Sequence, residues 1–520
     1  MKAGIRFELD ARTLPANADE VLTPHIATAC GVAATDILSY RIVKRSLDAR
    51  RKPQVRILYQ VTAEIRDGVT PKRKVDPPES AEPTLLPENK AKLKHPLVIG
   101  SGPAGLFAAL VLAEAGAEPV VIERGRDVVR RKQDIDTFFC SRTLNPESNL
   151  LFGEGGAGTW SDGKLYTRVR DPRGRYVLNE FVRAGARQEI LYYAHPHIGS
   201  DRLPDIIAAI RERVRSLGGT FLWDSQVVRI EGDTRFRAVH LTDGTRIDAP
   251  AALIACGHSA RSLIESLTGQ IEFAMKGFQI GCRIEHPQSF INRTQYGMEQ
   301  PCPSLGAAEY LFSTHGNGPV QGATTFCMCP GGEIIPAASE EGRLSTNGMS
   351  ESTRGGQFAN SAIVSAIAPT AFRTPADAFA FLRGLEASLF EKGGGNYTAP
   401  AQNARDFLEC RSGRLPQSSS YRLGLRQSRL DNLIPEPVGS ALANALRRFD
   451  RLAPGFVRNG LLIGMETRVS SPVRFLRNPE TLESSMRGLY LGGEGSGMAG
   501  GIVSAAIDGI RLAEKMLTNP

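Results

Sequence analysis

The sequence predicts an α/β protein in which a Rossmann-like dinucleotide-binding domain is split by an inserted α+β domain and preceded by a small α/β module. Three observations support this prediction. First, a strand, a glycine turn, a helix and a second strand follow one another over 97–124. Second, a strand followed by a glycine turn occurs again at 488–501. Third, a chain of 520 residues is too long to fold around one hydrophobic core of ordinary size. The expected parts are residues 1–70, a linker at 71–95, the first part of the dinucleotide domain at 96–269, the insert at 270–460 and the second part at 461–520.

The first glycine turn spans Gly100–Gly105 and directly follows the apolar run Leu97–Ile99. In such a unit the first glycine permits the turn, the second lets a pyrophosphate approach the backbone, and the third lets the helix pack on the strand. The helix N-terminus offers unpaired N–H groups to a diphosphate. Glu123 ends the second strand, about 20 residues on, where an acid accepts hydrogen bonds from an adenosine ribose. A dinucleotide site is predicted; the alternative is a glycine turn needed only for packing.

Composition and length exclude several classes of protein. The N-terminus lacks the basic and apolar pattern of a secretory signal, and no apolar run approaches the roughly 18 residues that span a bilayer. The eight cysteines are scattered without a disulfide-framework spacing, which fits reduced thiols. We therefore expect a cytoplasmic protein with no membrane contact.

The positive charge is concentrated near the N-terminus. Residues 41–74 hold eleven Lys or Arg against three acids, a difference equal to the net charge of +8 for the whole chain. A docking surface for nucleic acid is one interpretation, and a solvated basic face is the other. Tyr59 is the single aromatic residue between Arg41 and Lys74, so base stacking is disfavoured.

The N-terminal module is expected to have ferredoxin-like character. Strand patterns at 5–9, 37–43 and 54–63 and an amphipathic segment at 19–30 predict a β-α-β-β order. A proline-rich linker follows. Its prolines are Pro71, Pro77, Pro78, Pro83 and Pro87.

A second glycine cluster occupies 151–164, with five glycines in eleven positions. One interpretation is a backbone surface pressed against the cofactor, and the other is a long flexible surface loop. Phe152, Trp160 and Leu165 favour the first. The segment that follows predicts a helix at 204–217 and strands at 220–223, 227–231, 238–241 and 245–247.

Two later strands also run into glycine turns. Residues 251–255 lead into Cys256-Gly257-His258, where Cys256 is interpreted as a small buried residue and His258 as a turn residue. Residues 488–491 lead into the turn 492–501, and a helix is predicted from Ile502 to Met516. Because no acid-ended strand follows, this second helix N-terminus is expected to close on the same cofactor.

The insert contains one pair of candidate catalytic residues, Cys327 and Cys329. Thiols near a redox cofactor could exchange electrons with it, and a C-x-C disulfide is strained and easily reduced. The alternative is packing, because buried cysteines are usually inert. No metal site is expected, since the pair supplies too few ligands.

These pieces resemble the two-part FAD site of the glutathione-reductase type. The Cys327–Gly332 segment, the cluster 155–164 and the segment Lys44–Arg50 are similar, more narrowly, to a widespread group of FAD-dependent dehydrogenases of unassigned substrate. The resemblance implies that the first turn and Glu123 hold the ADP half, that Glu494 meets the ribityl chain, and that the last helix faces the flavin. Glu494 stands where many members have Asp.

Together, the residue pattern and the resemblance assign cofactor binding to a set of residues in an FAD-binding Rossmann-like domain. They are Gly100, Gly102, Pro103, Ala104, Gly105, Glu123, Arg124, Gly156, Ala157, Gly158, Lys164, Val227, Cys256, Gly257, Gly493, Glu494, Gly500, Gly501 and Ile502.

The resulting hypothesis is an FAD-dependent oxidoreductase that transfers a hydride to or from a small-molecule substrate. A single G-x-G-x-x-G turn predicts no separate NAD(P)H domain, so NAD(P)H is expected as a transient donor, or the organic substrate reduces the flavin directly. Three alternatives stay open: an RNA-associated flavoprotein that uses 41–74, a flavin monooxygenase, and a non-enzymatic FAD-binding module. The oligomeric state is not predicted.

Overall fold

The structure is a computed structural model that describes residues 1–78, 92–316 and 321–519. The predicted linker falls partly outside these ranges, because 79–91, with Pro83 and Pro87, are not described. None of the helices in the described ranges is both long enough and apolar enough to cross a membrane.

The N-terminal module has the predicted strand, helix, strand, strand order. Its elements are β1 (Lys2–Asp10), α1 (Thr23–Cys30), β2 (Ile37–Asp48) and β3 (Arg56–Ile65). β3 lies between the other two strands and is antiparallel to both. Alternate residues of β3, from Ile57 to Ile65, are buried, as a half-covered strand requires. Residues 1–78 contain no second α-helix, so the full ferredoxin-like likeness stays a prediction.

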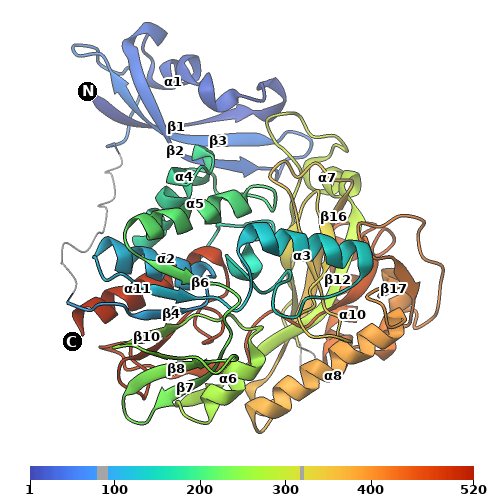
Figure 1. Cartoon of the computed structure of the whole chain (residues 1–520). Coiled ribbons are helices and arrows are strands. Elements are labelled where there is room, and N and C mark those ends of the chain that lie inside the picture. The colour runs from blue at the N-terminus through green and yellow to red at the C-terminus, as the bar shows by residue number, and fades with distance from the viewer. Residues whose placement is uncertain (79–91, 317–320, 520) are drawn as a thin grey trace.

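The first glycine turn belongs to a five-stranded parallel sheet, here called the central sheet, in the order β21-β10-β4-β5-β6. Its strands β4, β6 and β10 are labelled in Figure 1. The strands are β4 (Leu97–Ile99), β5 (Val120–Ile122), β6 (Thr220–Leu222), β10 (Ala252–Ile254) and β21 (Leu489–Leu491). Its helices are α2 (Pro103–Glu114), α3 (Val128–Ser141), α4 (Arg173–Arg183), α5 (Leu203–Ser216), α6 (Arg261–Thr268) and α11 (Ile502–Thr518). α2 packs against α11 and α5, which explains why residues 104–113 are all buried.

The predicted segment after 204 is present with its ends within two residues of expectation. β7 (Val227–Gly232), β8 (Phe236–Leu241) and β9 (Arg246–Asp248) form a separate antiparallel sheet. The N- and C-terminal halves of the central sheet meet because β21, from the end of the chain, pairs with β10. Segments about 390 residues apart in sequence therefore form one domain.

The insert is built on a six-stranded sheet in the order β13-β16-β12-β19-β17-β18. Its strands are β12 (Phe278–Pro287), β13 (Ala323–Cys329), β16 (Phe358–Ile367), β17 (Ala399–Asn403), β18 (Leu425–Gln427) and β19 (Leu461–Glu466). Its helices are α7 (Gln288–Tyr296), α8 (Pro375–Gly393), α9 (Ala404–Leu408) and α10 (Val438–Leu452). Two ribbons complete it, β11 (Phe273–Met275) with β20 (Val473–Phe475) and β14 (Glu333–Pro336) with β15 (Thr346–Met349). Since β19 pairs with β12 and β17, this sheet runs past the predicted division at residue 460.

A half-buried carboxylate of the N-terminal module, that of Asp19, contacts the body of the protein. Asp19 accepts hydrogen bonds from the hydroxyls of Tyr59 at 2.7 Å, Tyr192 at 3.2 Å and Tyr193 at 3.3 Å. Arg45 pairs with the same carboxylate at 3.2 Å. The outer edge of β2 also bonds to the body, because the backbone N–H of Arg45 donates to the carbonyl of Tyr192 at 2.8 Å. At least one residue of the basic segment is therefore a docking residue.

Replacing Asp19 with Ala is expected to lower the free energy of unfolding by about 2 kcal/mol, because three hydroxyls and one guanidinium lose a charged acceptor. Urea denaturation measures this change. Asp67→Ala is the control: Asp67 is fully exposed and contacts the N-terminal amine at 3.1 Å, so its removal should change stability by less than about 0.5 kcal/mol. Equal effects of the two changes would contradict the docking role of Asp19.

Candidate functional site

A cavity of about 470 Å³ opens at the carboxyl ends of the central parallel strands, where α/β sheets bind ligands. Every predicted cofactor residue except Gly105 lines it, and so does Cys327. Cys329 is fully buried and does not line it. The cavity therefore gathers residues from the first turn, the second glycine cluster, the turn after β10, the C-terminal turn and the insert.

The three glycines of the first turn meet different surroundings. Gly100 has a φ of +101° and its absent Cβ would lie 2.4 Å from the carbonyl oxygen of Ala255, so only glycine fits. A Cβ on Gly105 would lie 1.9 Å from the carbonyl oxygen of Gly100, because the helix packs tightly on the strand. A Cβ on Gly102 would meet nothing closer than Gly156, at 3.9 Å. The space in front of Gly102 is thus open to the cavity.

Glu123 ties the first turn to the second glycine cluster. One carboxylate oxygen accepts from the backbone N–H of Ser101 at 2.9 Å and from its hydroxyl at 2.8 Å. The other accepts from the N–H groups of Gly125 at 3.0 Å and Gly153 at 3.1 Å. An ionised carboxylate has about four acceptor sites for hydrogen bonds, and these four donors occupy them. In the structure, Glu123 therefore orders the first turn and the second glycine cluster. Its contact with a ribose stays a prediction.

The second glycine cluster is held by an arginine that the sequence analysis did not single out. Arg131 on α3 is fully buried and donates to the carbonyls of Asn149 at 2.8 Å, Glu154 at 2.6 Å and Gly156 at 2.9 Å. Phe152, Trp160 and Leu165 are buried as well. The cluster is therefore an ordered, anchored loop rather than a flexible one. Arg124, next to the cavity, stacks 3.8 Å above the ring of Phe152.

The C-terminal turn pairs with a histidine that was interpreted as a turn residue. His258 Nδ1 lies 3.2 Å from Glu494 Oε2, and His258 lines the cavity. His258 Nε2 is buried and has no hydrogen-bond partner among the described residues. Beyond this pair, Gly500 and Gly501 leave open space at the N-terminus of α11. Two helix N-termini thus face one cavity.

Cys327 lies at a bulge of β13, and its φ is +47°. The bulge bends the strand where it borders the cavity. Arg283 on β12 is fully buried and donates to the Cys327 carbonyl at 2.9 Å and to the Cys329 sulfur at 3.4 Å. Lys164 donates to the carbonyl of Met328. The hydrogen bond from the Cys329 thiol lowers the pKa of Cys327, and the positive charges of Lys164 and Arg283 lower it further. Burial acts in the opposite direction but is outweighed. The same hydrogen bond and burial raise the pKa of Cys329.

Cys256 differs from Cys327 although it also lines the cavity. Burial raises the pKa of the Cys256 thiol to about 12, so this cysteine stays a neutral thiol. Cys256 is half-buried rather than fully buried, so its interpretation as a small buried residue stays a prediction. All eight cysteines are free in the structure, and the described residues contain no group of three or more His, Cys, Asp or Glu that could hold a metal ion.

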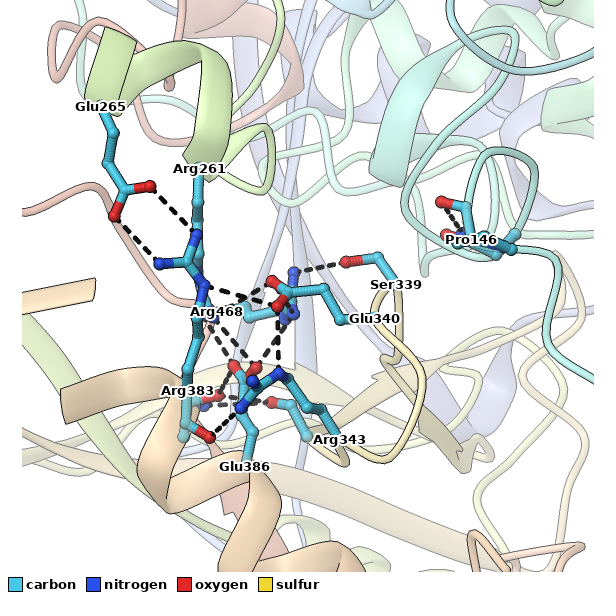
Figure 2. A network of polar contacts seen from close by, with 12 residues as sticks. Pro146, Arg261, Glu265, Ser339, Glu340, Arg343, Arg383, Glu386 and Arg468 are labelled. Carbon is cyan, nitrogen blue, oxygen red and sulfur yellow. Dashed lines mark hydrogen bonds and ion pairs between the residues drawn. The ribbon is translucent and has the colours of Figure 1, made fainter. Parts of the chain in front are cut away.

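A buried network of arginines and glutamates joins the insert to the central domain behind the cavity wall (Figure 2). Glu386 on α8 accepts two hydrogen bonds from Arg261 of α6, at 3.0 and 2.7 Å, and one from Arg468 at 3.0 Å. Arg468 follows β19 and lines the cavity. Burial raises the pKa of Glu386, but Arg468 and Arg261 outweigh burial and lower it to about 2. The network therefore fixes Arg468 in place. Its partners lie on separate elements, so no local sequence pattern predicts it.

The cavity fits FAD on the evidence of its glycines. Gly102 and Gly500 present backbone with no side chain in the way, each beside the N-terminus of a helix that favours negative charge or a hydrogen-bond acceptor. The anchored loop at Gly156–Gly158 supplies a third backbone surface on the same cavity.

Comparisons with known protein families also support an FAD site. A family model described as an FAD binding domain matches residues 95–135, and one described as FAD-dependent protein, C-terminal domain-like, matches 277–469. A domain of unknown function matches 5–64. A protein of Clostridium beijerinckii, described as an uncharacterized protein, is 40% identical over 515 residues and covers 96% of each chain.

Two solved structures show weaker likeness. Glycine oxidase from Geobacillus kaustophilus has 12% identity and a TM-score of 0.35, covering 82% of this chain and 94% of its own. Glycerol-3-phosphate dehydrogenase from Bacillus halodurans, complexed with FAD, has 9% identity and a TM-score of 0.35, covering 83% and 66%. TM-scores of this size carry no argument here. With a relative matched over nearly the whole chain and two FAD-dependent domains recognised within it, the protein belongs to a family of FAD-dependent flavoproteins and is an FAD-dependent oxidoreductase.

Proposed function

We propose that the protein is a dehydrogenase or reductase that transfers a hydride between FAD and a small molecule held against the insert. The observation that carries this proposal is the single cavity lined by both glycine turns and by Cys327. In this proposal, which follows the resemblance to the glutathione-reductase type, the first turn and α2 hold the ADP half. The C-terminal turn and α11 hold the flavin half.

The chain's own residues then have distinct tasks. The N–H groups at the start of α2 bind the diphosphate, and Gly156–Gly158 with Lys164 hold the cofactor from the second glycine cluster. Bound FAD supplies the two-electron chemistry. The six-stranded sheet of the insert walls the cavity and excludes water from it. Cys327 presents a thiolate to the cavity, and Cys329 acts through Cys327 by donating a hydrogen bond, so Cys329 is a positioning residue in this proposal.

An anaerobic titration of the purified protein with NADPH and then NADH, followed by visible absorbance, tests this function. Bleaching of the flavin band by either nucleotide is the expected result and names the electron donor. If neither nucleotide bleaches the band, a transient NAD(P)H site is excluded and an organic substrate or partner protein must reduce the flavin. If no donor of any kind reduces the bound flavin, the protein is a non-enzymatic FAD-binding module.

The alternative functions lack a specific supporting observation. Within the basic segment, Arg45 is used for docking, and Arg50 and Arg56 pair with Asp48 and Glu8. This reduces the charge free to bind RNA. A monooxygenase is distinguished by oxygen consumption coupled to a hydroxylated product. The cytoplasmic location stays a prediction.

A further inference from the structure

Glu466 is a buried carboxylate on the cavity wall that the proposed function does not yet use. It ends β19, is 1% exposed and lines the cavity beside Cys327. Its Oε2 accepts one hydrogen bond, from Arg283 at 2.7 Å. Its Oε1 accepts none from the residues that the structure describes. Oε1 is therefore the oxygen left to carry a proton.

We infer that Glu466 is the acid that supplies the proton accompanying hydride transfer in this cavity, and that the substrate class is a compound with a polarised double bond. This inference rests on the proposed function. The class comprises ketones and aldehydes, imines, and alkenes conjugated to a carbonyl. Each needs one hydride at its electrophilic carbon and one proton at the neighbouring atom.

The contrast with Glu386 shows why Glu466 is suited to this task. Both side chains are buried and both pair with arginine, but Glu386 accepts three bonds from two arginines and a fourth from the Thr467 hydroxyl at 2.6 Å. Glu386 does not line the cavity. Two carboxylates whose surroundings push their pKa values apart are the usual sign of an acid and a structural anion. Glu386 is the structural anion, and Glu466 is the acid.

The charged and titratable groups around Glu466 come from three elements. Arg283 faces it from β12, Cys327 from β13, and His258 from the turn after β10. Burial, together with the nearby Cys327, raises the pKa of Glu466 to about 7 against the opposing charge of Arg283. Near neutral pH the group can both hold and release a proton. This is the range in which a general acid is most effective.

The hydride that reduced FAD supplies forms the C–H bond at the electrophilic carbon, and the π pair moves to the neighbouring oxygen, nitrogen or carbon. The Oε1–H bond of Glu466 breaks, its pair stays on the carboxylate, and the proton bonds to that neighbouring atom. The substrate gains two electrons and reduced FAD loses two. The guanidinium of Arg283 stabilises the carboxylate that forms.

The first test follows the acid itself in the FAD-loaded protein, without turnover. Infrared difference spectra recorded as the pH rises should lose the C=O band of a protonated carboxylic acid with a midpoint near pH 7, and Glu466→Gln should remove this component. Glu285→Gln is the matched control, because Glu285 is buried on β12 and bonded to Ser420 but does not line the cavity. It should leave the component in place. A wild-type protein with no Glu466-dependent band at acid pH overturns the inference.

The second test uses substrate. Protein with reduced FAD is mixed anaerobically with cyclohexanone, a cyclic imine or cyclohexenone, and reoxidation of the flavin is followed. For the compound that wild type reduces fastest, Glu466→Gln should slow reoxidation about 100-fold and abolish the fall in rate above neutral pH, while Glu466→Asp restores part of the rate. Glu285→Gln should react as wild type does.

Two results of the second test contradict the inference. A wild-type rate and pH profile in Glu466→Gln would remove Glu466 from the reaction. Failure of all three compounds to reoxidise the flavin would show that the substrate class is wrong. The proposed function is judged separately, by whether any donor reduces the bound FAD, so the two failures are distinguishable.

Discussion

Replacing Gly102 with Asp is expected to weaken FAD binding about 1,000-fold, which corresponds to about 4 kcal/mol of binding free energy. The backbone of Gly102 is open to the cavity at the N-terminus of α2. A carboxylate there repels the FAD diphosphate and fills the space through which it approaches. The measurement is a fluorescence titration of FAD with the apoprotein, together with the flavin absorbance of the protein as purified.

Gly384→Asp provides the control for this change. Gly384 lies on the exposed side of α8, where an added Cβ meets nothing within 4 Å, so the same new charge is introduced away from the cavity. This variant should bind FAD as wild type does. Circular dichroism should show both variants folded. Unchanged FAD affinity in folded Gly102→Asp protein would contradict the assignment of the diphosphate to the first turn.

Replacing Cys327 with Ser is expected to lower turnover about 100-fold or more, because a hydroxyl cannot provide the thiolate that the site stabilises. The pH dependence of alkylation reports that thiolate directly. Since its pKa is lowered, the deprotonated form persists as pH falls, and iodoacetamide should still modify Cys327 at about pH 6, where an ordinary thiol with a pKa of about 8.5 is almost wholly protonated. Mass spectrometry separates Cys327 from the exposed Cys140 and Cys410.

Two further variants separate the thiolate from simple packing. Cys329→Ala should move the alkylation profile of Cys327 to higher pH, because it removes the thiol whose hydrogen bond lowers the pKa of Cys327. Cys140→Ser, on the exposed face of α3, should leave turnover unchanged. If Cys327→Ser and Cys329→Ser together leave flavin reduction and turnover unchanged, the pair has no catalytic role.

The dinucleotide unit could be predicted because its signal is local. Gly100, Gly102 and Gly105 each meet the surroundings that their place in the motif implies, and the strand, turn and helix follow within one short segment. Apolar runs followed by glycine also located β10 and β21. The sequence order therefore carried the information on which the central sheet depends.

The rest of the site depends on pairings between distant segments. Arg131 anchors the second glycine cluster from α3, and Arg283 joins Glu466 on β19 to Cys327 on β13. Nothing in the sequence around Glu466 marks it, because it looks like the polar end of an apolar strand. Strand β19 lies beyond the predicted division at 460 and pairs with β12 of the insert; short apolar strands look alike in either domain, so the sequence does not separate them there.

Glu123 shows a second limit on what a sequence motif can predict. Its position at the end of β5 predicts a ribose-binding acid, which stays a prediction, and in the structure its carboxylate also accepts from four protein donors. A motif fixes where an acid stands, but its partners depend on loops that fold beside it. Here Gly153 of the second cluster supplies one of those donors.

The most direct test of this account is a crystal structure of the protein with FAD bound. The account predicts the diphosphate at the N-terminus of α2 beside Gly102, and the isoalloxazine ring against Cys327 and Glu466 near the N-terminus of α11. A ring that lies away from the Cys327 and Glu466 wall, or an ADP half at Gly500 and Gly501, would contradict it.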